Sequence, residues 1–233
     1  MDNLLITHGH LDHASGIPYY ISQRSLRKLK PPKIYLPEVM YEPMQQILAL
    51  YSQMEDFPYN YTMQVCRSGE MYPLNSQYSF TSYPTFHRVA SQGYTVYETR
   101  KKLKAKFQGI AGEEILKLKK QGVEITEVIQ IPIVSFSGDT RSDYLWEYED
   151  VRKSKILFME CTYIDEERGI AASREWGHTH LDEIFAKADR LENEKLVLIH
   201  FSKRYSNRYI RHTVKQKTPP SLEGRIHCFL PEE

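Results

Sequence analysis

One short segment near the start of the chain restricts what the whole chain can fold into. The apolar residues 4–6 are followed at once by the sequence HGHLDH at residues 8–13, which places three imidazoles and one carboxylate within six residues. Burying such a set without a metal is costly, because the imidazoles repel one another once charged and lose hydration in any case. The segment therefore predicts a metal site that directly follows a short buried strand.

Further apolar runs end in the same way. A histidine or an acidic residue follows each of them: His87 after residues 83–86, Asp139 after 133–136, Glu160 after 156–159, and His200 after 196–199. These β-branched-rich runs alternate with segments of helical spacing at residues 17–29, 43–53, 113–120 and 181–191. This mixture is typical of an α/β fold. We therefore expect a single α/β domain over residues 1–233, with the ligand-type side chains at one edge of its sheets.

The types of side chain indicate which metals would bind. Imidazole nitrogens and carboxylate oxygens suit borderline dications such as Zn²⁺, and Mn²⁺ is an alternative occupant. The set has more than four members, which favours two ions that share a carboxylate. We therefore expect two Zn²⁺ per chain. His212 and His227 lie outside the set and are interpreted as structural or surface residues.

Composition excludes other classes of protein. No run approaches 18 apolar residues, and no basic segment followed by an apolar one opens the chain, so neither a membrane span nor a secretory signal is expected. The three cysteines form no CxxC pair, which favours idle thiols in a reducing compartment. We expect a cytoplasmic protein, and an organelle stays open. A formal net charge of +1 leaves a nucleic-acid partner open as well.

Six motifs resemble those of the tRNase Z family within the metallo-β-lactamase superfamily. They are HGHLDH at 8–13, HRVASQGY at 87–94, SGDT at 137–140, ECTY at 160–163, GHTH at 177–180 and HFSKRY at 200–205. Their order and approximate spacing agree with the family, so the resemblance covers almost the whole chain. The segments RKKL at 100–103 and KKQGVEIT at 119–126 are similar to short, plant-like members.

The resemblance implies an architecture and an activity. The architecture is the four-layer αββα sandwich of the superfamily. Family members usually carry strands before the HGHLDH motif, which begins here at residue 8, so we expect a shortened sandwich with an uncovered sheet edge. The activity is that of an endoribonuclease that removes 3′ trailers from precursor tRNA and leaves a 3′-hydroxyl on the tRNA. The family forms homodimers, and residues 17–29 are a candidate interface.

Carried over residue by residue, the resemblance also implies a set of metal ligands. One ion would be held by His8, His10 and His87, the other by Asp12, His13 and His200, and Asp139 would bridge the two. Asp12 would in addition orient the metal-bridging hydroxide that attacks the phosphodiester. His178 would lie near the leaving 3′-oxygen and act as general acid, oriented and charged by Glu160. A buried structural pair is the alternative for Glu160 and His178.

Two segments are expected to contact RNA. Ser202, Arg204 and Tyr205 would lie beside the last ligand and hold the scissile end, with strand-to-helix packing as the alternative. Residues 100–130 are interpreted as a reduced tRNA-binding insertion. Its Lys101, Lys102 and Lys104 would contact phosphates, and a solvated charged face is the alternative.

Two other functions stay open. One is a different hydrolase of the superfamily, such as a phosphodiesterase that acts on a small substrate. The other is an inactive RNA-binding or scaffold protein. An assay of precursor tRNA against a small phosphodiester separates the first alternative from the tRNA-processing function. Metal analysis tests the second, because two bound zinc ions argue against an inactive scaffold.

Overall fold

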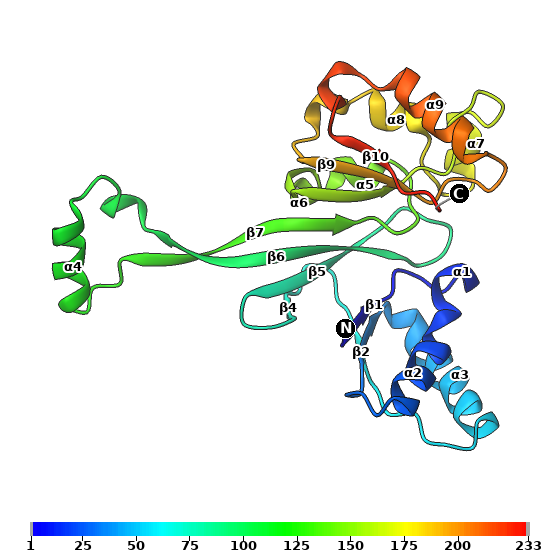
Figure 1. Cartoon of the computed structure of the whole chain (residues 1–233), viewed down its shortest axis with the longest axis horizontal. Coiled ribbons are helices and arrows are strands. Elements are labelled where there is room, and N and C mark those ends of the chain that lie inside the picture. The colour runs from blue at the N-terminus through cyan, green and yellow to red at the C-terminus, as the bar shows by residue number, and fades with distance from the viewer. Residues whose placement is uncertain (1, 232–233) are drawn as a thin grey trace.

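The computed structural model describes residues 2–231 of the chain (Figure 1), and two β-sheets dominate it. The smaller sheet is parallel and has the order β1-β2-β3. Its strands are β1 (Asn3–Leu5), β2 (Lys33–Leu36) and β3 (Thr62–Val65). Among the described residues β2 is the only strand that pairs with β1, so β1 forms one edge of this sheet.

The larger sheet has the order β10-β9-β8-β7-β6-β5-β4. Its strands from β7 to β10 are parallel, and those from β4 to β7 pair antiparallel. The bounds are β4 (Tyr72–Pro73), β5 (Tyr78–Pro84), β6 (Gln92–Leu103), β7 (Thr126–Phe136), β8 (Ile156–Glu160), β9 (Lys195–Ile199) and β10 (Ile226–Cys228).

Helices lie on the outer side of each sheet (Figure 1). Beside the smaller sheet are α1 (Leu11–Ala14), α2 (Gly16–Leu26) and α3 (Tyr41–Met54). Beside the larger sheet are α5 (Asp143–Glu147), α6 (Glu149–Lys153), α7 (Ile170–Glu175), α8 (Leu181–Phe185) and α9 (Asn207–Lys217). None of the helices in residues 2–231 combines the length and apolarity that crossing a membrane requires.

Three buried clusters fill the spaces between these layers. One joins α1–α3 to the smaller sheet, and another joins α5, α6, α8 and α9 to the larger sheet. The third lies between the two sheets, where Phe80 packs edge-on against Tyr35 with ring centroids 4.8 Å apart. The hydroxyl of Tyr94 donates to the carbonyl oxygen of Ile6 at 2.6 Å and so ties the sheets together. Three interlayer cores give four layers, which is the expected αββα arrangement.

Strands β6 and β7 extend beyond their neighbours and form a two-stranded arm that projects from the body, with α4 (Gly112–Lys120) at its tip (Figure 1). The predicted insertion at residues 100–130 lies in this arm. Pairing continues to Leu103 opposite Thr126. In the sequence, the short runs at 94–97 and 133–136 predict much shorter strands than β6 and β7, because residues 98–103 are mostly charged or polar and have no buried face that would produce an alternating pattern.

The predicted helix at residues 181–191 is wrong in extent. Helix α8 ends at Phe185, and a separate 3-10 turn follows at Ala188–Arg190. The apolar residues of the pattern (Leu181, Ile184, Ala188 and Leu191) are all buried. The spacing therefore identified the buried face correctly, although the backbone between Phe185 and Ala188 leaves the helical conformation.

Candidate metal centre

The ends of the strands explain why distant residues meet. Strands β7, β8 and β9 are parallel, and β5 runs in the same direction because two antiparallel pairings separate it from β7. Their carboxyl ends therefore lie along one edge of the larger sheet. His87, Asp139, Glu160 and His200 lie at or just beyond these ends. Strand β1 of the facing sheet brings residues 8–13 to the same place.

Three overlapping groups of ligand-type atoms form there, and the third combines Asp139, His178 and His200. In each group, one ligand atom per residue lies within 4.8 Å of all the others. The first group is His8, His10, His87 and Asp139, and the second is Asp12, His13 and His200. All seven residues predicted as ligands are thus brought together.

Asp139 lies between the first and second groups. Its Oδ2 atom is 3.7 Å from Nε2 of His8 in the first group. The same oxygen is 3.4 Å from Nε2 of His13 and 3.4 Å from Nε2 of His200 in the second group. One buried carboxylate oxygen therefore faces histidines of both groups, as a shared ligand must.

The nitrogen spacing in the first group fits one tetrahedral ion. His10 Nδ1 is 3.1 Å from His8 Nε2 and 3.3 Å from His87 Nε2. Two nitrogens bound at about 2.1 Å to a tetrahedral zinc ion lie about 3.4 Å apart. The imidazoles therefore converge on a point that a metal ion can occupy.

His87 and His200 each form a hydrogen bond through Nδ1, the ring nitrogen that points away from the centre. These bonds fix the tautomer that metal binding requires. His87 donates its Nδ1–H to the carbonyl oxygen of Gly177 at 2.8 Å, and a carbonyl can only accept. The hydroxyl of Thr162 donates to Glu160 at 3.0 Å, so it accepts from Nδ1 of His200 at 3.0 Å. Both rings consequently direct the lone pair of Nε2 toward the centre.

Electrostatics favour the metal-binding protonation states of His8, His87 and Asp139, whereas burial of His13 is outweighed by the hydrogen bond to Asp139 and by nearby negative charge, which raise the pKa of that imidazole. Burial lowers the pKa of His8 to about 3, and burial also lowers the pKa of His87. Burial opposes ionisation of Asp139, but the hydrogen bond from His13 and the charges of His200, His13 and His8 outweigh it and lower the pKa of this carboxyl. Neutral imidazoles and an ionised carboxylate are the forms that ligate a metal.

Asp12 occupies a different environment from Asp139. It lies in the first turn of α1, and 70% of its side chain is exposed. Its Oδ2 atom is 3.6 Å from His13 Nε2 and 3.8 Å from His200 Nε2. An exposed carboxylate on the open side of the second group can reach both an ion and a solvent molecule.

Glu160 and His178 form a buried pair next to these groups. Glu160 is fully buried and accepts four hydrogen bonds: from Thr140 N, Thr162 N, Thr162 Oγ1 and His178 Nδ1. The His178 bond is 3.0 Å long. Burial disfavours the charged imidazole, but the hydrogen bond to Glu160 and its negative charge raise the pKa of His178. His178 also lies within ligand distance of Asp139 and His200.

Comparison with known proteins identifies the family. The family described as "Beta-lactamase superfamily domain" matches residues 1–201. The tRNase Z TRZ1 of Arabidopsis thaliana is 38% identical over 230 residues, which cover 98% of this chain and 82% of that protein. The chain belongs to the tRNase Z family of the metallo-β-lactamase superfamily. The predicted family, its enzyme class of metal-dependent hydrolases and the predicted fold are thereby confirmed.

Other members of the tRNase Z family agree. The chloroplastic tRNase Z TRZ2 of Arabidopsis thaliana is 37% identical over 213 residues, which cover 91% of this chain but 60% of that relative's length. Among solved structures, the short form of human tRNase Z superposes with a TM-score of 0.58 at 18% identity, covering 98% of this chain and 76% of that chain. At this identity the human structure supports the fold alone.

The residues predicted to contact RNA lie in two separate places. Ser202, Arg204 and Tyr205 follow β9 in the loop to α9, directly after His200, and Arg204 is exposed. Arg204 Nε donates to Ser202 Oγ at 3.1 Å. Lys101, Lys102 and Lys104 lie on the arm of this tRNase Z family member, away from the metal centre (Figure 1). Lys104 forms an ion pair with Glu124 at 2.7 Å.

Several residues that support the centre were not predicted. Thr162 and Gly177 accept hydrogen bonds from the predicted ligands His200 and His87, and Thr140 donates a backbone N–H to Glu160. All three lie inside the recognised motifs, so their proximity to predicted ligands was the available signal. His180, in contrast, accepts from the backbone N–H of Asp182 and caps α8, which agrees with a structural role.

The loop that carries Asp139 depends on Gly138. This glycine has φ +59°, and a Cβ atom added to it would lie 2.8 Å from Cβ of Thr7, the residue before His8. We expect Gly138→Ala to lower the free energy of unfolding by about 2–4 kcal/mol, because it adds both backbone strain and a steric clash. Urea denaturation measures this.

Gly224→Ala is the matched control for Gly138→Ala. Gly224 has φ +73°, but nothing lies within 4 Å of its Cβ position. Gly224→Ala should therefore lower the free energy of unfolding by only about 1 kcal/mol, which comes from backbone strain. Equal losses at both positions would show that the close approach to Thr7 has no energetic importance.

Proposed function

We propose that this chain is an endoribonuclease that removes the 3′ trailer from precursor tRNA by hydrolysis and leaves a 3′-hydroxyl on the tRNA. Relatives over most of the chain are named tRNase Z or ribonuclease Z. The observation that carries the proposal is the position of Asp139 between two histidine groups with the Glu160–His178 pair beside them. This arrangement combines a dinuclear metal site with a proton donor.

Two Zn²⁺ ions are the proposed cofactors, and Mn²⁺ suits the same ligands. We assign one ion to His8, His10 and His87, the other to Asp12, His13 and His200, and Asp139 to both. When bound, such a pair activates water and neutralises charge that develops on the phosphate.

The residues of the chain direct the proton transfers. Asp12, on the open side of the second group, accepts a hydrogen bond from the attacking water and orients it toward phosphorus. Glu160 accepts the Nδ1–H of His178 and stabilises the imidazolium. The Nε2–H of His178 then donates its proton to the leaving 3′-oxygen as its bond to phosphorus breaks.

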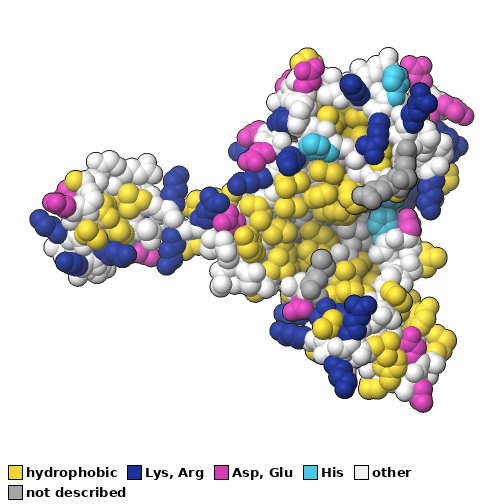
Figure 2. Space-filling view, viewed as in Figure 1, with side chains coloured by type: hydrophobic (Ala, Val, Ile, Leu, Met, Phe, Trp, Pro, Cys, Tyr) yellow, Lys and Arg dark blue, Asp and Glu magenta, His cyan; other side chains and the backbone are white. Residues whose placement is uncertain are grey.

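The distribution of charge supports RNA as the substrate. The whole chain has 31 Lys and Arg against 30 Asp and Glu, yet residues 196–222 contain six Lys or Arg and no acidic residue. Arg208, Arg211 and Lys215 recur at intervals of three and four residues, so they form one stripe along α9, and Arg204 lies in the loop just before this helix. All four are exposed, and none has a carboxylate partner among the described residues. In Figure 2, Lys and Arg side chains lie over this region of the molecule.

The stripe on α9 gives a prediction about salt. Changing Arg208, Arg211 and Lys215 to Gln should reduce the slope of log affinity against log salt concentration for precursor tRNA by about 2, because each lost phosphate contact removes about 0.7–0.9. Fluorescence anisotropy at several salt concentrations measures it. The control replaces Arg27, Lys30 and Lys33, which are also exposed but lie beside the smaller sheet. Equal slopes for the two triple variants would contradict the proposal that the stripe on α9 contacts RNA phosphates.

We also propose that the arm contacts the body of the tRNA, away from the scissile end. Lys101 and Lys102 are exposed on β6, and Lys117, Lys119 and Lys120 lie in the last turn of α4. Figure 2 shows Lys and Arg side chains along the arm. Lys104 contributes less, because Glu124 already neutralises it.

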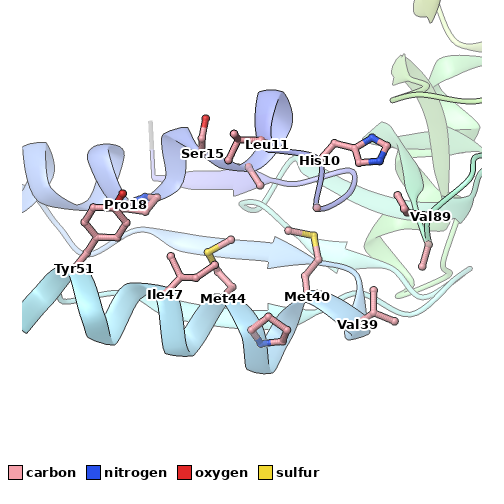
Figure 3. Close-up of a pocket in the computed structure, with 14 residues that line it drawn as sticks. His10, Leu11, Ser15, Pro18, Val39, Met40, Met44, Ile47, Tyr51 and Val89 are labelled. Atoms are coloured by element: carbon pink, nitrogen blue, oxygen red, sulfur yellow. The ribbon is translucent and has the colours of Figure 1, made fainter.

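A groove on the helices of the smaller sheet supports a homodimer. It has a volume of about 580 Å³, is lined mainly by apolar side chains of α1–α3 and begins at His10 (Figure 3). Leu11, Val39 and Ile47 line it, and Leu11 is 78% exposed. An apolar surface of this kind is typical of a protein interface. We propose that a second copy covers it, so the interface extends from the expected residues 17–29 to α1 and α3.

Disrupting this groove should separate the dimer. We expect Val39→Asp with Ile47→Asp to convert a dimer into a monomer, because two buried charges without partners destabilise an interface. Light scattering coupled to size-exclusion chromatography measures the mass. Val128→Asp is the control, since Val128 is also exposed but lies on the arm. A wild-type monomer at micromolar concentration would contradict the proposal.

The substrate is tested by comparing kcat/KM for a precursor tRNA with that for bis(p-nitrophenyl) phosphate. We expect a strong preference for the tRNA. Comparable values would favour a small-substrate phosphodiesterase instead. The cytoplasmic location stays a prediction, because relatives include proteins named chloroplastic and nuclear.

A further inference from the structure

A cation–aromatic pair lies at the rim of the metal centre. The guanidinium carbon of Arg88 is 4.6 Å from the centroid of the Trp176 ring. Arg88 is exposed, and Trp176 is 46% exposed. Neither side chain belongs to the buried clusters that hold the layers together. The pair is therefore placed for contact with something outside the fold.

The backbone holds the pair next to the centre. Arg88 follows the ligand His87, and Trp176 precedes Gly177 and His178. His87 donates to the carbonyl oxygen of Gly177 at 2.8 Å. A Cβ atom on Gly177 would lie 3.0 Å from the backbone nitrogen of Arg88, so the two loops touch. The rings of His87 and His178 are 5.1 Å apart.

The pair also lines a small hollow. Its volume is about 340 Å³, and its walls are His10, His87, Arg88, Val89, Trp176 and His178. This volume is at the lower end of the range for small-ligand sites, about 300–1,000 Å³. The hollow therefore has room for a single nucleotide, and it opens directly onto two ligand histidines and the proposed proton donor.

We propose that Arg88 and Trp176 form a stacking platform for the nucleobase adjacent to the scissile phosphate. This inference rests on the proposed function. Indole and guanidinium planes both stack on bases, and such stacking tolerates any base because every base has a π-face. The base stacks on the exposed face of the pair, and its phosphate then lies against the histidines. That base belongs either to the last tRNA nucleotide or to the first trailer nucleotide.

Substrates with one abasic nucleotide test the platform by cleavage. An abasic site at the stacked position should lower kcat/KM of the wild type by about 10- to 100-fold. Trp176→Ala should lower kcat/KM for the intact substrate by a similar factor, and the abasic site should then cost nothing further. Trp176→Phe should retain most of the activity. Abasic sites placed on either side of the scissile bond identify which nucleotide stacks.

Fluorescence tests the platform without cleavage. The chain has two tryptophans, so Trp146→Phe leaves Trp176 as the only indole. With metal bound, this variant is titrated with each product separately: mature tRNA ending in a 3′-hydroxyl, and trailer RNA carrying a 5′-phosphate. Stacking of the base should quench the indole emission with one of them. The control is Trp176→Phe, in which Trp146 stacks with Lys187 and Arg190 elsewhere and should not respond.

The outcomes separate this inference from the proposed function. Cleavage of precursor tRNA, with equal abasic penalties in wild type and Trp176→Ala and no quenching by either product, overturns the platform and leaves the function intact. Absence of any cleavage by the wild type overturns the function. In that case the fluorescence titration alone decides whether Trp176 stacks on a base. Quenching combined with a loss of the abasic penalty in Trp176→Ala supports the platform.

Discussion

Replacing His178 by Ala lowers kcat for precursor tRNA by about 10²–10⁴-fold and leaves the bound metal unchanged. This is the range expected when a general acid is removed. The physical reason is the buried Glu160 carboxylate, which holds Nδ1 of His178 at 3.0 Å and raises the pKa of its imidazole. Steady-state kinetics and metal analysis by mass spectrometry measure the two quantities separately.

A modified substrate isolates the proton transfer. A precursor with a 3′-phosphorothiolate at the scissile linkage has a sulfur leaving group that needs no proton. Wild type and His178→Ala should cleave it at similar rates. Because His178 also lies within ligand distance of Asp139 and His200, loss of metal in the variant would show that it is a ligand instead.

Replacing Asp139 by Ala has the second large effect. We expect turnover to fall by more than about 10³-fold, and the metal content to fall from about two to below one per chain, because the proposed dinuclear site would lose the carboxylate assigned to both ions. One oxygen of Asp139 lies 3.4–3.7 Å from histidines of both groups.

An isosteric variant and a distant control sharpen this result. Asp139→Asn retains the shape of the side chain but not its charge. Its metal content per chain should therefore be nearly as low as that of Asp139→Ala. His212→Ala, on the exposed side of α9, should keep both ions. Two ions per chain and near-normal turnover in Asp139→Asn would contradict the shared-ligand assignment.

Much of the centre could be predicted because its residues follow short apolar strands in dense motifs. The motifs that begin near His8, His87, Asp139 and His200 each place a candidate ligand just beyond the carboxyl end of a strand, and the larger sheet brings three of those ends together. His8, Asp139 and His200 were therefore identified from local sequence alone. Their hydrogen-bond partners, such as Gly177 for His87, were not, because membership of a neighbouring motif does not tell which backbone carbonyl a ring nitrogen will meet.

Features that depend on distant packing were the least predictable. The arm is formed by the antiparallel pairing of β6 with β7. Its outermost pair, Leu103 with Thr126, depends on the long-range register of the two strands and not on an apolar pattern. The groove on α1–α3 joins segments that are separate in the sequence. The contact between Arg88 and Trp176 spans 88 positions, and only the close approach of their loops reveals it.

In the proposed mechanism, water attacks the scissile phosphorus and the tRNA leaves with a 3′-hydroxyl. The direct measurement is cleavage of a precursor tRNA in ¹⁸O-labelled water, followed by mass spectrometry of both products. Metal-dependent hydrolysis predicts one solvent oxygen in the 5′-phosphate of the trailer, none in the tRNA, and no reaction after chelation of metal. A 2′,3′-cyclic phosphate on the tRNA, or cleavage that persists without metal, would contradict it.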